Sequence, residues 1–535
     1  MAHPPAGRRP GIRSLHPRTP VLVGVGTASA GAEPAELILR AVRAAADDCG
    51  VPGLLAAADR WAVPQGSWSY ADPARLVSRA LGAHRARTHL VGVGIPQQTP
   101  INDALAAIAA GRSEVAVVAG GEARRWARTS GAAETVQAEV VPDVHQLPSG
   151  ALVDPVEIAT RLWEPVQQYA MIDNALRYAE GRSLAEHRRE LAALGARCNL
   201  VAQGNPAAAF PQPMDAAAID TPSATNRPLA FPYNKWHVSQ WTVDQAAALV
   251  LCSVDAARRY GVPADRWVFP LVGIESSHAV PLVRRARPEA WPAMGVLGRA
   301  VAARLGRPVA AVEHVELYSC FPAAVRVQQR ELGLDPEGTP TVTGGMVFAG
   351  GPFNNYVLQA TVALVGRLRS GAGDGGDERG MVTSVSGLLT KPGIGVWSAS
   401  PDGRPVLVGD LVAPAARRTG VLEVVGTPDG YRGEATVVTY TVVPGGQAGT
   451  IGGTAPGGRH PGGPPVVVAL CHTADGRRCV AFSEDPAVAA VARETELIGA
   501  AVVVEAGGFR PEGPGARRGP DPAKTGRGRP GSGVR

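Results

Sequence analysis

The sequence predicts an α/β protein that is followed by a small all-β domain. Up to about residue 400, short β-branched apolar runs alternate with segments whose apolar residues have helical spacing. Beyond residue 402, strand-like runs are separated by turn residues, with only "PAVAAVARETEL" showing a helical pattern. The alternation predicts a mostly parallel sheet covered by helices on both faces. The later strands predict a small antiparallel barrel.

The first elements follow one another in regular order. "PVLVGVG" (20–26) is a buried strand, and "PAELILRAVRAAADDCG" (34–50) is a helix that ends at Gly50. The same alternation recurs as strand, helix and strand in "HLVGVG", "INDALAAIAAG" and "SEVAVVAGG", residues 89–94, 101–111 and 113–121. From 151 to 240 this order is interrupted by polar helices and Pro-rich loops. We expect that excursion to leave the sheet and to cover a site.

Strand and helix alternation then resumes. The predicted segments are "DQAAALVLCSVDAARRYG", "VEHVELYSCF", "GGMVFAGG" and "GMVTSVSG", of which "GGMVFAGG" is interpreted as a strand-like run. We therefore expect two similar halves on either side of the excursion. The predicted domains are a disordered tail (1–19), an α/β domain (20–400), a β-barrel domain (403–508) and a disordered basic tail (509–535).

The positive charge of the chain is concentrated in its two tails. The formal net charge is +6, but residues 1–19 carry four arginines and no acid, and residues 510–535 carry seven Lys or Arg against two acids. The remaining chain is therefore at −3, and we expect no nucleic-acid partner. Six widely spaced cysteines form no CxxC pair or zinc-ligand pattern, which predicts reduced thiols, no metal and a cytoplasmic protein. No apolar stretch reaches the roughly 20 residues that a membrane helix needs.

The glycines after the first strand suggest a dinucleotide site, which the spacing argues against. In "VLVGVGTASAG" the third glycine of the fingerprint is replaced by Ser29. We interpret these glycines as a tight turn from strand to helix.

Four motifs in order resemble the boxes of the thiolase superfamily, in its sterol-carrier-protein-type branch. "INDALAAIAAGRSEVAVVAGGEA" resembles the helix and strand that follow the family's nucleophile, and "VEHVELYSCF" resembles the strand that ends in its NEAF or HDCF box. "GGMVFAGGPFNN" resembles the GGAIALGHP box, and "GMVTSVSG" resembles the strand that ends in the second cysteine. The resemblance implies a five-layered αβαβα fold with acyl-CoA chemistry where its two halves meet.

The family's reaction depends on residue types that this chain replaces. A cysteine thiolate attacks the thioester, a second cysteine moves a proton, and histidine and asparagine bind the thioester oxygen. Here the nucleophile's place falls at Gly94 or Ile95, the GHP histidine becomes Gly351, the NEAF asparagine becomes Tyr318, and the second cysteine becomes Val385. We therefore do not expect ordinary thiolysis or Claisen condensation.

A thiolase-like body with such replacements and an added C-terminal barrel resembles the actinobacterial thiolase-like type 1 proteins. Proteins of that group are often labelled acetyl-CoA acetyltransferases by homology. The C-terminal strands also resemble the OB-like barrels that accompany thiolases.

Several side chains remain candidates for a site. Tyr318, Cys320 and Ser386 are the candidate catalytic residues. Tyr318 either donates to a carbonyl oxygen or fills space, Cys320 is interpreted as a structural thiol, and Ser386 lacks a histidine in its sequence context. The candidate substrate-binding residues are Gly94, Ile95, Tyr318, Gly350, Gly351, Asn354 and His237. One of Asn354 and Asn355 is expected to cap a helix, and a lone histidine such as His237 is more often structural.

Two classes of function follow from these observations. One is an acyltransferase-like enzyme of lipid metabolism that acts on acyl-CoA thioesters. The other is a non-catalytic protein that binds acyl-CoA or serves as a scaffold for an active thiolase or another β-oxidation enzyme. Coenzyme A thioester is then a ligand or substrate rather than a cofactor, and we expect a monomer.

Overall fold

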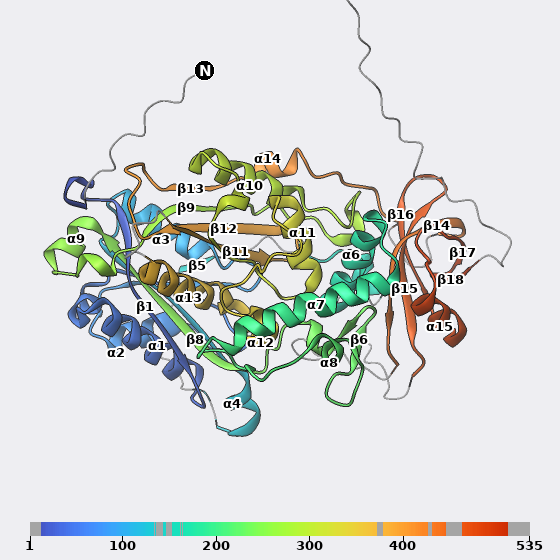
Figure 1. Ribbon diagram of the computed structural model, residues 1–535, viewed down its shortest axis with the longest axis horizontal. Helices are drawn as coiled ribbons and strands as arrows, with labels where there is room; N and C mark the ends of the chain where they lie inside the picture. The colour runs from blue at the N-terminus through green and yellow to red at the C-terminus, as the bar shows by residue number, and fades with distance from the viewer. Residues whose placement is uncertain are drawn as a thin grey trace, which may run out of the picture.

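The computed structural model describes residues 12–132, 134, 143–145, 152–160, 162, 164–371, 378–425, 431–445 and 463–511 (Figure 1). Most of each predicted tail, residues 1–11 and 512–535, lies outside these ranges. So does most of the Gly/Pro-rich segment between the first two strands of the barrel.

The first half of the chain forms a six-stranded sheet in the order β1-β8-β4-β2-β3-β5. Its strands are β1 (Pro20–Ser29), β2 (Arg60–Pro64), β3 (Arg87–Val91), β4 (Val115–Ala123), β5 (Asp143–His145) and β8 (Asp244–Ser253). Strands β2, β3, β4 and β5 pair in parallel, whereas β8 runs antiparallel to both β1 and β4. The sheet is therefore mixed, because the strand that returns from the excursion enters in the opposite direction.

The second half forms a five-stranded sheet in the order β10-β11-β12-β9-β13. Its strands are β9 (Phe269–Glu275), β10 (His314–Glu316), β11 (Arg379–Ser386), β12 (Lys391–Ser398) and β13 (Leu407–Asp410). The series β9-β12-β11-β10 repeats the series β1-β8-β4-β2, and in each series the second strand is antiparallel to both of its neighbours. This shared order confirms the prediction of two similar halves.

Helices form three layers around the two sheets (Figure 1). Helices α3 (Thr99–Ala109) and α13 (Tyr356–Gly371) lie between the sheets and contact strands of both. Helices α1 (Pro34–Cys49) and α2 (Pro73–Ala80) cover the outer face of the first sheet, and α10 (Pro292–Leu305) and α11 (Pro322–Leu332) form the outer layer of the second half. The short helices α9 (Val254–Arg259) and α14 (Val412–Ala416) pack beside them. This arrangement is the predicted five-layered αβαβα fold.

Close packing of helix α1 on strand β1 depends on a glycine. A Cβ atom at Gly26 would lie 2.4 Å from the carbonyl oxygen of Ala41, so any larger side chain would force the helix away from the strand. The helix begins with Pro34 in its first turn and ends at Gly50, which has φ 71° in the left-handed region. Gly50 therefore ends this helix as the sequence predicts.

The excursion between β4 and β8 is mainly helical. Its elements within residues 151–240 are α5 (Pro155–Ala159), α6 (Pro165–Ala179), α7 (Leu184–Gln203), α8 (Ala216–Asp220), β6 (Pro228–Ala230) and β7 (Tyr233–Asn234), and the short helix α4 (Arg124–Thr129) precedes them directly after β4. Helix α7 begins with a capping box in which Ser183 and Glu186 bond each other's backbone N–H groups.

The segment "GGMVFAGG" forms helix α12 (Gly345–Phe348), so its prediction as a strand is wrong. Backbone N–H groups of Gly344 and Gly345 donate to the Thr341 hydroxyl, which bends the chain into a helical turn. The turn packs against α7.

A closed five-stranded barrel follows the second sheet, in the order β14-β15-β16-β18-β17. Its strands are β14 (Gly433–Val443), β15 (Val466–Thr473), β16 (Arg478–Ser483), β17 (Ala501–Glu505) and β18 (Gly508–Pro511), with α15 (Pro486–Glu494) between β16 and β17. Strands β16 and β18 pair in parallel, and all other neighbours are antiparallel. This order is that of an OB-type barrel, as predicted. The barrel strands begin at Gly433 rather than near residue 403, because β13 pairs with β9 in the second sheet.

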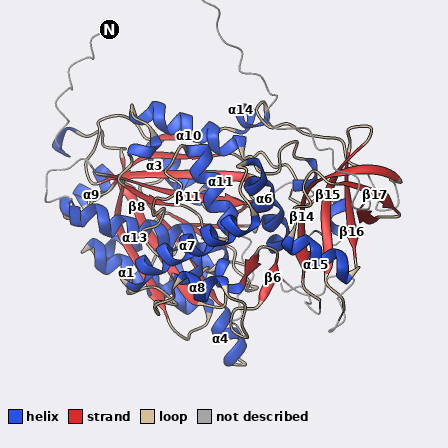
Figure 2. Ribbon diagram, turned by 45° about the vertical axis from the view of Figure 1, so that its right-hand side comes forward, coloured by secondary structure: helices blue, strands red, loops and turns tan. Residues whose placement is uncertain are grey.

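The barrel packs against helix α6 of the excursion (Figure 2). The Asn174 amide donates to the carbonyl oxygen of Tyr440 at 3.0 Å, and the Thr439 hydroxyl donates to the carbonyl oxygen of Met171 at 2.6 Å. Arg177 forms an ion pair with Glu496 at 2.6 Å. These contacts attach the barrel to the α/β body at the excursion.

Candidate functional site

The amino-terminal ends of the two central helices meet at Gln97, a buried residue that precedes α3. Its Nε2 atom donates to the Tyr318 hydroxyl and to the Phe353 carbonyl oxygen, both at 3.2 Å. Its Oε1 atom accepts from the N–H of Val357 in the first turn of α13 at 2.9 Å. One side chain, just ahead of the first box, therefore bonds residues of two other boxes and satisfies a helix-terminal donor.

The place expected for a nucleophile is occupied by a backbone carbonyl. The carbonyl oxygen of Gly94 accepts a hydrogen bond of 2.6 Å from the Ser386 hydroxyl and a second bond from the ammonium of Lys391. Burial lowers the pKa of Lys391 to about 8. The turn that positions this lysine contains Leu388 and Leu389 at φ 59° and 60°, a conformation that costs free energy for side-chain-bearing residues.

Tyr318 is buried and faces Gln97 from the second half. Its backbone N–H donates to the Thr383 hydroxyl at 2.8 Å, and its ring meets Tyr356 edge-on with centroids 5.7 Å apart. Burial raises the pKa of Tyr318 well above its ordinary value. The phenol is therefore a neutral hydrogen-bonding group at neutral pH.

Gly351 lies where a side chain has no room. A Cβ atom there would lie 1.8 Å from the Ser239 hydroxyl oxygen. The backbone N–H groups of Gly351 and Ser239 are both hydrogen-bonded, which holds the two segments in place. The Gly351 N–H donates to the Gln240 carbonyl oxygen at 3.0 Å, and the Ser239 N–H donates to the Cys320 carbonyl oxygen at 2.9 Å. Ser239 therefore fills the volume that a histidine side chain at position 351 would need.

Cys320 is a half-buried thiol beside this contact. Burial raises its pKa to about 12, although a hydrogen bond with Tyr169 opposes the change. The neighbouring Phe321 ring stacks on Tyr169 with centroids 4.3 Å apart. The thiol is therefore protonated at neutral pH, and its surroundings are those of a packed aromatic layer.

The remaining predicted binding residues are divided between two places. Ile95 and Gly350 are buried at the junction beside Gly94 and Gly351, and Asn354 is half-buried there with its Nδ2 atom unpartnered among the described residues. His237 instead lies in the excursion, where the N–H of Asn234 donates to its Nδ1 atom at 3.0 Å. Burial lowers the pKa of His237 to about 4, so the ring is neutral. Binding roles for these residues stay predictions.

Neither asparagine caps helix α13 as we expected. The Asn355 side chain is buried and makes no hydrogen bond to any described residue, and the Val357 N–H is bonded by Gln97 instead. The cap comes from the other half of the fold, which a local sequence pattern does not reveal.

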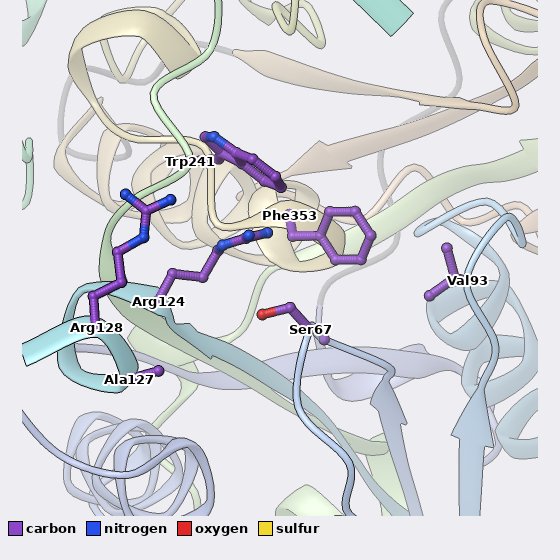
Figure 3. A pocket seen from close by; sticks show the side chains of 8 residues that line it. Ser67, Val93, Arg124, Ala127, Arg128, Trp241 and Phe353 are labelled. Atoms are coloured by element: carbon purple, nitrogen blue, oxygen red, sulfur yellow. The ribbon is translucent and has the colours of Figure 1, made fainter. Parts of the chain in front are cut away.

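A cavity of about 440 Å³ opens beside the junction (Figure 3). It is lined by Gly66, Ser67, Val93, Arg124, Ala127, Arg128, Trp241 and Phe353. Val93 precedes Gly94, and Phe353 is the residue whose carbonyl accepts from Gln97. The guanidinium of Arg124 lies 3.4 Å from the centre of the Trp241 ring.

Sequence reasoning missed Gln97, Ser239, Lys391 and Arg124. Gln97 and Arg124 were detectable in part, because each follows shortly after a predicted buried strand on the chain. The importance of Ser239 and Lys391 comes from contacts across the fold.

Groups of three or more side chains able to hold a metal do not occur among the described residues. Within the same ranges, each helix is too short or too polar to cross a bilayer.

The duplicated sheets, the two central helices and the junction between them have the arrangement of the thiolase fold. Among proteins with this fold, the chain is similar to a monomeric SCP2-thiolase-like protein type 1 from Mycobacterium smegmatis. The two are 28% identical, with a TM-score of 0.74, over 91% of this chain and 97% of that chain. An Ltp2–ChsH2(DUF35) aldolase shares the fold at 20% identity, with a TM-score of 0.55, over 73% of this chain and 100% of that chain. No protein-family model matches the chain, and no curated protein matches its sequence.

Proposed function

We propose that this protein binds acyl-CoA thioesters at the junction of its two halves without carrying out cysteine-dependent thiolysis. The observation that carries the proposal is the hydrogen bonding at Gly94, whose carbonyl oxygen accepts from Ser386 and Lys391. The thiolase resemblance puts the nucleophile at Gly94 or Ile95, and here the polar groups around Gly94 are bonded to one another. The likeness in fold to thiolases supports the ligand class by analogy, and the side chains argue against the reaction.

The alternative is an acyltransferase-like enzyme that uses a different set of residues. Its candidates are Tyr318, Cys320 and Ser386, and the surroundings of each argue against catalysis. Burial raises the pKa values of the phenol and the thiol, so neither forms an anion near neutral pH. The Ser386 hydroxyl donates to a carbonyl oxygen rather than to a base. We therefore favour the binding function.

Both functions require that the protein binds acyl-CoA thioesters. Calorimetric titration of the purified full-length protein with CoA, acetyl-CoA and a long-chain acyl-CoA tests this requirement. We expect saturable binding of the thioesters. A parallel assay of acetoacetyl-CoA cleavage with CoA is expected to show no turnover above buffer. Turnover that survives C320A but is lost in Y318F would establish the enzymatic alternative, and an absence of binding to all three compounds would reject both functions.

In the cell, we propose that the protein takes part in lipid metabolism as a cytoplasmic, monomeric acyl-CoA-binding protein. The solved relative with 28% identity is described as monomeric, which supports the last point. The barrel already packs against helix α6 of the same chain and provides a surface for an active thiolase or another β-oxidation enzyme. Light scattering on a sizing column measures the oligomeric state directly.

A further inference from the structure

The cavity beside the junction lies at the carboxyl ends of three adjacent parallel strands. Gly66 and Ser67 follow β2, Val93 follows β3, and Arg124 follows β4 directly. Strand β2 pairs in parallel with both β3 and β4. In open α/β sheets, this edge is where ligands bind, because the loops that leave neighbouring strands surround a common space.

Two arginines bring positive charge to this cavity. Arg124 and Arg128 both project from α4 toward the side where Trp241 lies (Figure 3). Neither forms an ion pair with a carboxylate of any residue that the structure describes. The stacking of Arg124 on Trp241 fixes the plane of the guanidinium and leaves its N–H edges available for an acceptor.

Glu122 is a carboxylate that interacts electrostatically with Arg124, and its oxygens are hydrogen-bonded elsewhere. Its oxygens accept from the Ser67 N–H at 2.9 Å, the Ser67 hydroxyl at 2.7 Å and the Ala123 N–H at 3.1 Å. Glu122 is buried and does not line the cavity. The charge that faces the cavity is therefore that of the two arginines.

The other side chains that line the cavity include apolar and aromatic ones. Val93, Phe353 and Trp241, on whose ring Arg124 stacks, provide these surfaces, and the total volume is within the range of small-molecule sites. An occupant must therefore combine anionic oxygens with a less polar body.

We propose that this cavity binds the oxyanion group of a ligand, a phosphate or a carboxylate, through Arg124 and Arg128, while the rest of the ligand packs against Trp241 and Phe353. A planar guanidinium matches both groups by donating two parallel hydrogen bonds. Val93 and Phe353 place the cavity next to the junction, so the bound oxyanion can belong to an acyl-CoA. For that ligand, the inference rests on the proposed function. Binding of the anion itself does not depend on that function.

Calorimetric titration with pyrophosphate, succinate, CoA and phosphate-free pantetheine separates the two oxyanion sources. The variants are R124Q/R128Q and the matched control R125Q, which changes an exposed arginine of the same helix that does not line the cavity. We expect pyrophosphate or succinate to bind the wild-type protein and R125Q equally, and R124Q/R128Q at least tenfold more weakly. CoA is expected to follow the same order, and pantetheine to bind all three proteins alike.

The outcomes are distinguishable. Equal binding of the anions to all three proteins, or no binding of either anion to the wild-type protein, overturns the inference. If CoA binds but is unaffected by R124Q/R128Q, the proposed function stands and this site is rejected. If an anion binds through the two arginines while CoA does not, the site stands and the proposed function fails. Equal melting temperatures of the variants verify that the comparison concerns binding rather than folding.

Discussion

The Nε2 atom of Gln97 lies 3.2 Å from the hydroxyl oxygen of Tyr318 and joins the two halves of the fold. The two residues are far apart on the chain, and both are buried. The same side chain also bonds the Phe353 carbonyl oxygen and the Val357 N–H. Gln97 therefore connects the first helix of the central layer to the second.

Replacing Gln97 with leucine is expected to destabilise the protein by about 1–3 kcal/mol, because buried donors and acceptors lose their partners. Y318F removes only one of the three hydrogen bonds of the Gln97 side chain, and we expect it to lower the free energy of unfolding by about 1 kcal/mol. Urea unfolding of the two single variants and the double variant measures the coupling. Strictly additive free energies would show that the Gln97–Tyr318 contact has no energetic role.

Adding a methyl group at Gly351 is expected to destabilise the fold by about 1–3 kcal/mol through overpacking. The new Cβ atom would lie 1.8 Å from the Ser239 hydroxyl oxygen, and S239G should restore part of the loss. G366A is the matched control, because a Cβ there, within helix α13, meets no atom within 4 Å. Equal melting temperatures for G351A and G366A would contradict the close contact.

The pH dependence of stability should change when Lys391 becomes methionine. Burial lowers the pKa of Lys391 to about 8 in the folded protein, below its ordinary value of 10.5. Between these values the unfolded chain binds more protons, so this lysine makes stability rise with pH. The stability of wild type relative to K391M is therefore expected to increase by on the order of 2 kcal/mol from pH 8 to 10.5. A constant difference across this range would show that the lysine titrates normally.

Glu275 is expected to make the stability of the fold fall as pH rises, the opposite of the effect of Lys391. Burial raises its pKa to about 8, although a hydrogen bond from Thr99 at the start of α3 opposes the change. The protonated form is favoured in the folded protein, so the contribution of Glu275 to stability is lost as pH rises from about 4.5 to 8.

E275Q should therefore become more stable relative to wild type across this window, by at most roughly 1.4 kcal/mol per pH unit. Thermal unfolding from pH 5 to 8 measures the effect. The exposed Glu337 provides the matched control E337Q, the same substitution at the surface. A trend of equal size in both variants would contradict the assignment to Glu275.

Much of the fold was predictable because local patterns determine its elements. The β-branched runs became β1, β4 and β11, and Gly50 ended α1 by adopting the left-handed conformation. The prediction for "GGMVFAGG" was wrong because its apolar letters suit a strand as well as a buried helical turn. The hydroxyl of Thr341, not the apolar pattern, decides the outcome there.

By itself, the sequence predicted the layers, the two halves and the barrel, and it predicted that the reactive residues of thiolases are replaced at Gly94 or Ile95, Tyr318, Gly351 and Val385. The alternation of strands and helices predicts the two halves and the barrel, whereas the layers and the replaced positions are implied by the resemblance of four motifs to the thiolase boxes. Only the tertiary structure decided which groups fill two of those places, Lys391 at the Gly94 carbonyl and Ser239 against Gly351. It alone also decided that Arg124 stacks on Trp241. Such contacts join residues whose separation along the chain is unrelated to their separation in space, so only the packed fold reveals them.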